Sequence, residues 1–172
     1  MHFDNPIQTR SMMGYRFDAP CGLYCGACPT IHAGRKGELA ELAKLWETDP
    51  ADLVCRGCLS DTTAVFCREC RFRSCAASKG IEHCFRCDTF PCADLVKFRN
   101  DDMPHHSVVL ANLARMREAG LEGWLEEQRV RWSCPSCGEP FAWYDEKCGK
   151  CGAGLFDSRA EEKTLPREEA GS

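Results

Sequence analysis

The sequence predicts a small, irregular α+β fold that is stapled by metal, in which short helices and cysteine knuckles precede a helical pair and a C-terminal β-hairpin. The first observation behind this prediction is composition: 15 of the 172 residues are cysteine, close to the level that indicates a disulfide or metal scaffold. The second is spacing, because twelve of these cysteines form C-x-x-C pairs, in which two thiolates can bind one metal ion. The six pairs are Cys25/Cys28, Cys55/Cys58, Cys67/Cys70, Cys84/Cys87, Cys134/Cys137 and Cys148/Cys151.

A disulfide framework explains the cysteines less well than metal does. Their number is odd, so complete pairing would leave a thiol over. Residues 1–20 have no continuous apolar stretch to serve as a secretory signal, and no run of about 18 apolar residues could span a membrane. We therefore expect a cytoplasmic protein, where paired cysteines indicate metal or redox chemistry. The net charge of −4 gives no overall attraction to nucleic acid.

The chain divides into five expected parts. An irregular leader covers residues 1–17, and a cysteine-rich metal-binding domain covers 18–104. A helical pair without cysteine follows at 105–131, then a zinc ribbon at 132–156. Residues 157–172 are polar, charged and aperiodic, which predicts a disordered tail.

Short helices are expected between the cysteine clusters. Apolar residues at helical spacing predict a helix within residues 37–50, with Leu45 and Trp46 on its apolar stripe. Two more are expected at 75–80 and 91–98, the first ended by a glycine and the second begun by a proline.

The helical pair is predicted from an apolar stripe that Gly120 interrupts. We expect this stripe to cover the metal-bound core, and a docking face for a partner is the alternative. Its residues are Val109, Leu110, Leu113, Met116, Leu121, Trp124, Leu125 and Val130.

The strongest metal signal is Cys134-Pro-Ser-Cys137-Gly followed by Cys148-Gly-Lys-Cys151-Gly. A glycine after each second cysteine permits a tight knuckle, and the ten residues between the pairs can form a hairpin. Four thiolates without histidine indicate a tetrahedral zinc ion with no open position, which is a structural site. Four aromatic residues are expected in the core of this ribbon, with stacking on bases or a partner as the alternative: Trp132, Phe141, Trp143 and Tyr144.

Eleven further cysteines are candidate ligands: Cys21, Cys25, Cys28, Cys55, Cys58, Cys67, Cys70, Cys75, Cys84, Cys87 and Cys92. Eleven ligands do not divide into four-ligand sites, but one histidine would complete three such sites. His32 is the best-placed histidine, and His83 is next. Thiolates that bridge two ions, or one cysteine that binds no metal, would also account for eleven ligands. The sequence leaves open which cysteines share an ion.

The spacing Cys21-x3-Cys25-x2-Cys28 is that of the cluster loop in radical S-adenosylmethionine enzymes. This chain is too short for their barrel, and Ala27 stands where that motif usually has an aromatic residue. A plain [4Fe-4S] cluster held by these three thiolates and a remote fourth is the better alternative to zinc.

Two other patterns lie in the same region. The spacing C-x2-C-x4-C of Cys67, Cys70 and Cys75 recurs seventeen residues later, which a duplicated metal-binding turn would explain. One basic stretch interleaved with Phe66 and Phe72 could touch phosphates. We favour a solvated face whose cations offset thiolate charge, and the cations are Arg68, Arg71, Arg73 and Lys79.

The order and spacing of several motifs resemble the prokaryotic domain-of-unknown-function family 3795. Those motifs are Cys21-Gly-Leu-Tyr-Cys25-Gly-Ala-Cys28-Pro, Cys55-Arg-Gly-Cys58, and Cys84-Phe-Arg-Cys87 leading into Phe90-Pro91-Cys92. Residues 121–135 are similar to members with an appended zinc ribbon, so the likeness covers roughly residues 18–155. It implies a bacterial or archaeal cytoplasmic protein with bound metal, and it implies no activity and no catalytic residues.

We therefore expect a non-enzymatic zinc-binding adaptor or regulatory protein that engages a protein partner or, with weaker support, nucleic acid. No membrane and no small-molecule substrate is indicated, because the sequence has no phosphate-binding glycine loop and no recognisable nucleophile setting. The alternative is an iron–sulfur redox or electron-transfer protein that uses the N-terminal cysteine cluster.

Overall fold

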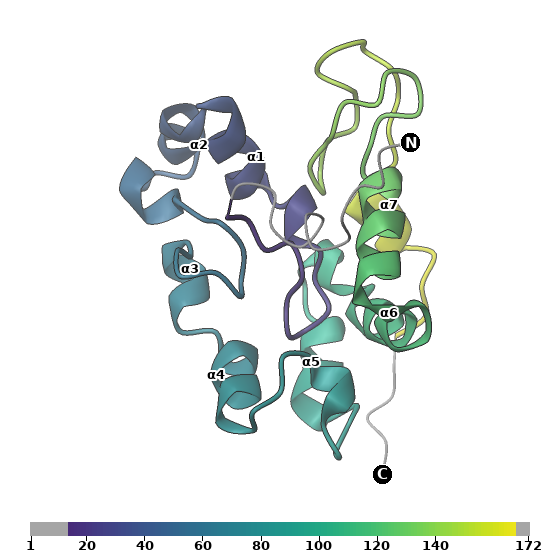
Figure 1. The fold of residues 1–172 in the computed structure, drawn as a ribbon. Helices are drawn as coiled ribbons and strands as arrows, with labels where there is room; N and C mark the ends of the chain where they lie inside the picture. Colours follow the sequence, from purple (N-terminus) through teal and green to yellow (C-terminus); the bar gives the residue numbers. More distant parts are fainter. Residues whose placement is uncertain (1–13, 168–172) are drawn as a thin grey trace, which may run out of the picture.

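The computed structural model describes residues 14–167, which are mainly helical (Figure 1). The first helices are α1 (Pro29–Lys36), α2 (Leu39–Leu45), α3 (Val65–Arg68), α4 (Arg71–Ser78) and α5 (Ala93–Arg99). Between them lie the 3-10 turns η2 (Cys25–Ala27), η3 (Pro50–Leu53), η4 (Cys84–Arg86) and η5 (Pro104–His106). The last helices are α6 (Val109–Arg131) and α7 (Ser158–Glu162). Most of the expected leader, residues 1–17, lies outside the described part.

Cysteines set where several of the short helices begin. Cys28, Cys70 and Cys92 are the N-cap residues of α1, α4 and α5, and each has extended backbone angles. Pro29 follows Cys28 at the first helical position, where the missing N–H costs nothing. The helices therefore start directly after candidate metal ligands and remain seven or eight residues long.

Helix α2 is shorter than the apolar stripe that predicts it. Ala43 is buried, but Leu45 is 77% exposed and Trp46 is 43% exposed. The helix ends at Leu45, so these two side chains leave the stripe and lie on the surface.

Helix α6 changes direction at Gly120, whose φ of 74° and ψ of 161° are not helical. The guanidinium of Arg115 pairs with the carboxylate of Glu127 at 2.6 Å. In a straight helix, residues twelve apart would be separated by about 18 Å along the axis. The two halves, residues 109–119 and 121–131, therefore fold back toward each other at the glycine that interrupts the sequence pattern.

One hydrophobic core joins the cysteine-rich region to α6. The α6 side chains of Val109, Leu113 and Trp124 are fully buried and belong to the same cluster as Cys21 and Cys58. Figure 1 shows α1 to α4 along one side of the molecule and α6 on the other, with the segment around η2 between them. The apolar stripe of α6 thus packs on the cysteine-rich region.

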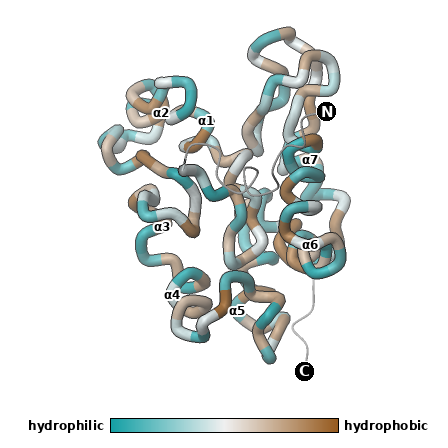
Figure 2. The backbone as a smooth tube through the Cα atoms, in the orientation of Figure 1, coloured by the Kyte–Doolittle hydropathy of each residue, from teal (hydrophilic) through white to brown (hydrophobic). Residues whose placement is uncertain are grey.

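Hydrophobic and hydrophilic residues alternate along the helices in Figure 2. No helix within residues 14–167 is long and apolar enough to cross a membrane.

The expected C-terminal β-hairpin is not shown as strands among the described residues. Residues 132–156, here called the four-cysteine module, contain two isolated antiparallel bridges, Ser133–Pro140 and Lys147–Gly154. Pro140 has no N–H to extend a ladder. The backbone of Trp143 bonds outside the module, donating to Ala27 at 3.0 Å and accepting from Ser158 at 2.8 Å. At Trp143, backbone hydrogen bonds to the rest of the fold therefore take the place of pairing within the module.

Part of the expected disordered tail, residues 157–172, is ordered. The side chain of Asp157 caps α7 by accepting a hydrogen bond from the N–H of Ala160 at 2.8 Å. Ser158 is buried. Residues 168–172 lie outside the described part of the chain.

Candidate metal centre

The four sulfur atoms of the four-cysteine module converge on one point. All the Sγ atoms of Cys134, Cys137, Cys148 and Cys151 lie within 4.8 Å of one another. The distance from Cys134 to Cys151 is 3.6 Å, and that from Cys137 to Cys148 is also 3.6 Å. Zinc–sulfur bonds of 2.3 Å in a tetrahedron would separate the sulfurs by about 3.8 Å. The donor set therefore fits a tetrahedral ion and fills all four of its positions.

Each half of this site is a tight cysteine turn. The N–H of Gly138 donates to the carbonyl of Cys134 at 2.8 Å, and that of Gly152 donates to Cys148 at 2.9 Å. Both glycines have left-handed φ angles, 73° and 74°. Backbone N–H groups of Cys151 and Lys150 lower the pKa of the Cys148 thiol to about 6. The backbone N–H of Glu139 acts to lower the pKa of the Cys137 thiol, but desolvation and hydrogen bonds with the other three sulfurs outweigh it and raise that pKa to about 12. The turn N–H groups therefore favour the thiolate form, which a metal ion requires, at Cys148.

Aromatic residues fasten the module to the helical core. Trp132, Phe141 and Trp143 are each less than a tenth exposed. The indole N–H of Trp132 donates to the Gln128 amide oxygen at 3.2 Å, and the Trp143 ring stacks on His105 with centroids 4.0 Å apart. These rings fill the protein interior, where they cannot stack on the bases of a nucleic acid.

Seven cysteines from separate segments gather beside this core and are here called the central cysteine group: Cys21, Cys25, Cys28, Cys55, Cys58, Cys67 and Cys70. Burial raises the pKa of Cys25, and the neighbouring thiols Cys28, Cys21 and Cys55 raise it further. Burial, then Cys28 and Cys55, raises the pKa of Cys67 to about 12. Residues far apart in sequence therefore share one buried, thiol-rich environment.

The remaining four cysteines, Cys75, Cys84, Cys87 and Cys92, lie together around a different cavity. Burial raises the pKa of Cys84 to about 12, and the thiols of Cys92, Cys75 and Cys87 add to this effect. Within residues 14–167, only the four-cysteine module brings three or more Cys, His, Asp or Glu ligand atoms within 4.8 Å of one another.

Comparison with known families bears on the segment that holds these eleven cysteines. The sequence model of a family described as "Protein of unknown function (DUF3795)" matches residues 17–97. The residues that match this model, 17–97, are here called the DUF3795 segment. The match ends in α5, so α6 and the four-cysteine module lie beyond it and the family likeness is narrower than residues 18–155. Neither the curated proteins nor the solved structures contain a significant match to the chain.

Both histidines of the DUF3795 segment that are candidate ligands make hydrogen bonds within the fold. His32 Nε2 lies 2.9 Å from the carbonyl oxygen of Gly26, and His83 Nε2 lies 3.0 Å from the carboxylate of Asp18. Burial lowers the pKa of His32. Each ring therefore has one nitrogen engaged, and neither histidine joins the sulfurs of the four-cysteine module.

The network around Asp18 was not anticipated from the sequence. Arg16 donates to both carboxylate oxygens of this buried side chain, at 3.0 and 2.8 Å. Burial acts to raise the pKa of Asp18, but hydrogen bonds from His83 and Arg16 outweigh it and hold that pKa well below its usual range. Arg16, Asp18 and His83 form no local sequence pattern that predicts this network.

Hydroxyl groups next to two thiols were also missed, although the sequence carries a signal for them. Thr30 Oγ1 lies 3.1 Å from Cys28 Sγ, and Thr89 Oγ1 lies 3.3 Å from Cys87 Sγ. Both follow the second cysteine of a C-x-x-C pair by two residues. A Cys-x-Thr pattern after a knuckle therefore predicts a hydroxyl–sulfur contact.

The basic stretch of the DUF3795 segment is internally paired. Arg68 lies 3.7 Å from Asp52, and Arg71 lies 2.5 Å from Asp94. Arg73 donates to Thr63 and to the carbonyl of Ser60, while Lys79 donates to Cys87 Sγ at 3.1 Å. All four cations thus have partners within the fold. This pairing favours a face whose cations offset neighbouring negative charge over a surface that binds phosphates.

The repeated C-x2-C-x4-C spacing does not produce two equivalent turns. Cys75 is the fifth residue of α4, whereas its counterpart Cys92 precedes α5 as the N-cap. The third cysteines therefore occupy different places in the local structure, and the repeat is one of spacing alone.

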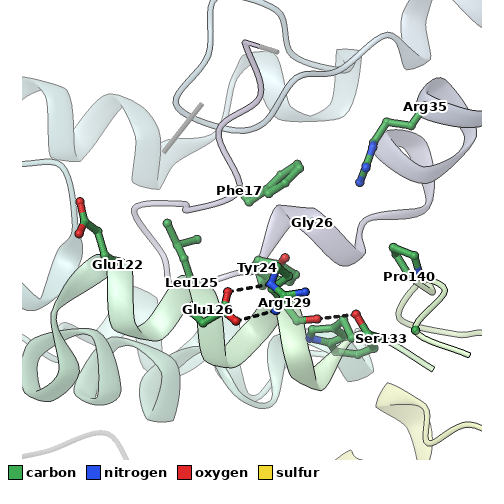
Figure 3. Close-up of a pocket in the computed structure, with 12 residues that line it drawn as sticks. Phe17, Tyr24, Gly26, Arg35, Glu122, Leu125, Glu126, Arg129, Ser133 and Pro140 are labelled. Atoms are coloured by element: carbon green, nitrogen blue, oxygen red, sulfur yellow. Dashed lines mark hydrogen bonds and ion pairs between the residues drawn. The ribbon is translucent and has the colours of Figure 1, made fainter. Parts of the chain in front are cut away.

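A crevice of about 240 Å³ lies where the DUF3795 segment, α6 and the four-cysteine module meet (Figure 3). Tyr24 and Leu125 supply apolar surface, and Arg35 and Arg129 face it together with Glu122 and Glu126. The Arg129 guanidinium is already paired with Glu126 at 2.6 Å. Its lining mixes both charges and points to no particular small molecule.

Proposed function

We propose that the chain is a non-enzymatic zinc-binding adaptor, in which metal ions hold the DUF3795 segment and the four-cysteine module as one scaffold that binds a protein partner. The observation that carries this proposal is the convergence of four sulfurs within 4.8 Å. Four thiolates leave a tetrahedral ion no open position for a substrate or water, so such a site stabilises structure and does not catalyse.

A protein partner is favoured over nucleic acid by the surface of α2 and α3. The cations of the basic stretch are paired within the fold, so binding phosphates would first require those pairs to break. Exposed apolar side chains offer a different surface: Trp46 and Phe66, 43% and 56% exposed, contact each other with ring centroids 6.3 Å apart. Leu45 directly precedes Trp46 in the chain and is more exposed still. Exposed aromatic pairs of this kind are typical anchors in protein interfaces.

A reducing cytoplasm is the compartment we propose for this adaptor. All fifteen cysteines lie within the described residues, and none of them is paired in a disulfide there. Such thiols persist where glutathione and thioredoxin keep them reduced.

The second candidate function, iron–sulfur redox chemistry, is supported by the central cysteine group. Cys21, Cys25 and Cys28 lie in one loop, and the thiol of Cys55 and the backbone N–H of Cys58 approach Cys25 from another segment. Ligation by four cysteines in a buried setting is what an iron–sulfur cluster requires. This function would make electron transfer, instead of partner binding, the role of the chain.

The adaptor proposal is tested by replacing Trp46 and Phe66 together with serine. A partner that co-purifies in constant ratio with the wild-type chain should be lost from the double variant. Val130→Ser is the matched control, because Val130 is a 59% exposed apolar residue on α6, and it should keep the partner. If the wild type, the double variant and Val130→Ser all recover the partner equally, the surface formed by Trp46 and Phe66 does not bind it.

A further inference from the structure

Four cysteines of the DUF3795 segment line one small cavity between α4, η4 and α5. The cavity measures about 30 Å³, and Cys75, Cys84, Cys87 and Cys92 all face it, together with Lys79. A space of this size is enough for one water-sized occupant. The rest of its wall is mainly apolar, so the four sulfurs and one ammonium are the groups that would decide what binds there.

The surrounding elements place each sulfur separately. Cys84 and Cys87 belong to one turn, in which the N–H of Cys87 donates to the carbonyl of Cys84 at 3.0 Å. Cys75 projects from α4, and Cys92 precedes α5. The two helices are held together by Phe72 and Phe98, whose ring centroids lie 4.9 Å apart. Three separate segments therefore place four sulfurs around one cavity, although these sulfurs are not as close together as those of the four-cysteine module.

The charge around the cavity suits a metal–thiolate complex. A divalent ion bound to four thiolates carries a net charge of about −2. Lys79 Nζ donates to Cys87 Sγ at 3.1 Å, and the hydroxyl of Thr89 lies 3.3 Å from the same sulfur. A cation and a hydroxyl already directed at a ligand would stabilise the negative complex.

We propose that Cys75, Cys84, Cys87 and Cys92 form a second four-thiolate site for zinc or a similar soft divalent ion, which ties α4 to the start of α5. Its sulfurs are spread more widely than those of the four-cysteine module, so binding draws the two helices together. The assignment separates Cys75 from Cys67 and Cys70, its companions in the repeated spacing, and leaves seven cysteines in the central group. It holds whether or not the chain is an adaptor.

Alkylation of the zinc-loaded wild-type chain tests this site without any substitution. The native protein is treated with N-ethylmaleimide, and the labelled cysteines are identified by mass spectrometry before and after a chelator is added. Cys75 is exposed, so a free thiol there should react at once. We expect all four cysteines to be protected together and to become reactive together when zinc is removed. Rapid labelling of Cys75 while Cys84, Cys87 and Cys92 stay protected would overturn the assignment.

Cadmium-113 NMR of the cadmium-loaded chain tests the same grouping through variants. Cys87→Ser should remove one signal, Cys137→Ser should remove a different one, and Ser74→Ala on α4 should remove neither. Persistence of the Cys137-dependent signal in Cys87→Ser shows that this variant is folded. The proposal fails if Cys87→Ser retains every signal of the wild type. If Cys87→Ser does not fold, the wild-type alkylation pattern decides. Loss of the adaptor role alone would leave both results unchanged.

Discussion

The backbone N–H of Trp143 donates a hydrogen bond of 3.0 Å to the carbonyl oxygen of Ala27, and both residues are buried. Trp143 lies between the two cysteine turns of the four-cysteine module, whereas Ala27 lies in the turn between Cys25 and Cys28. The module is therefore bonded directly to the first candidate ligand loop of the DUF3795 segment, and the state of one should affect the other.

Removal of the metal from the four-cysteine module should loosen the DUF3795 segment as well. Cys148→Ser deletes one of four ligands, and structural zinc contributes on the order of 10 kcal/mol to the folding of small thiolate modules. We expect faster hydrogen exchange at the amides of η2 as well as within the module. Ser136→Ala, an exposed change inside the same Cys134–Cys137 turn, should leave exchange unaltered. Increased exchange confined to residues 132–156 would show that the two parts are uncoupled.

Gly57 should not tolerate even one added methyl group. A Cβ there would lie 1.6 Å from the carbonyl oxygen of Arg16, and the φ angle of Gly57 is 110°. Gly37→Ala separates backbone strain from steric clash, because Gly37 has a φ of 76° but no atom within 4 Å of the added carbon. We expect Gly37→Ala to cost about 1 kcal/mol from backbone strain alone. Gly57→Ala should lower the free energy of unfolding by more than this, as measured by urea unfolding. Similar losses of stability in the two variants would contradict the close approach of Gly57 to the Arg16 carbonyl.

The buried carboxylate of Asp18 should make stability depend on acid pH. Its pKa in the folded chain is held below the unfolded value of about 3.9. The ionised network therefore contributes its full stability above about pH 4 and loses it as the pH falls toward the folded pKa. Asp18→Asn should lower the free energy of unfolding at pH 7 by about 3 kcal/mol, because it leaves Arg16 and His83 without their buried partner.

The matched control for this prediction is Glu82→Gln. Glu82 pairs with Arg16 at 3.4 Å, but its side chain is 56% exposed, so the change should cost less than about 1 kcal/mol. Thiolates also protonate in acid. The quantity to compare is therefore the difference in the free energy of unfolding between wild type and Asp18→Asn, measured across pH 3–7. A constant difference over that range would contradict the assigned pKa direction.

Sequence spacing was sufficient to predict the four-cysteine module because all its ligands lie in two tight turns. The turn glycines Gly138 and Gly152 mark those turns in the sequence itself. The expected β-hairpin is not shown as strands within residues 14–167, and the backbone of Trp143 bonds to Ala27 and Ser158, which lie outside the module. A local pattern cannot show that tertiary partners will replace strand pairing.

The grouping of the other eleven cysteines could not be predicted for a similar reason. Cys75 follows Cys67 and Cys70 closely in the chain, but α4 places it beside Cys84 and Cys92 around another cavity. The folding back of α6 at Gly120 is the opposite case, since a glycine within an apolar stripe predicts an interruption. Leu45 and Trp46 continue a helical stripe in the sequence but lie on the surface, where α2 ends.

Freshly purified protein should yield nearly all fifteen thiols. Denaturation with a chelator and no reductant releases metal-bound thiolates but leaves disulfides intact. A thiol-reactive dye should therefore count close to the full number, and adding reductant should increase the count little. Recovery of only a few thiols would place the chain in an oxidising compartment and contradict the metal-stapled account.

The identity of the bound metal tests the account most directly. Chain purified without oxygen should be colourless and contain about three or four zinc ions, one for each set of four ligands. Metal analysis and a visible spectrum of the same sample give both quantities. Cys25→Ser should then remove zinc without changing colour. A brown sample with iron and acid-labile sulfide, both lost in Cys25→Ser, would contradict the zinc adaptor and establish the iron–sulfur alternative.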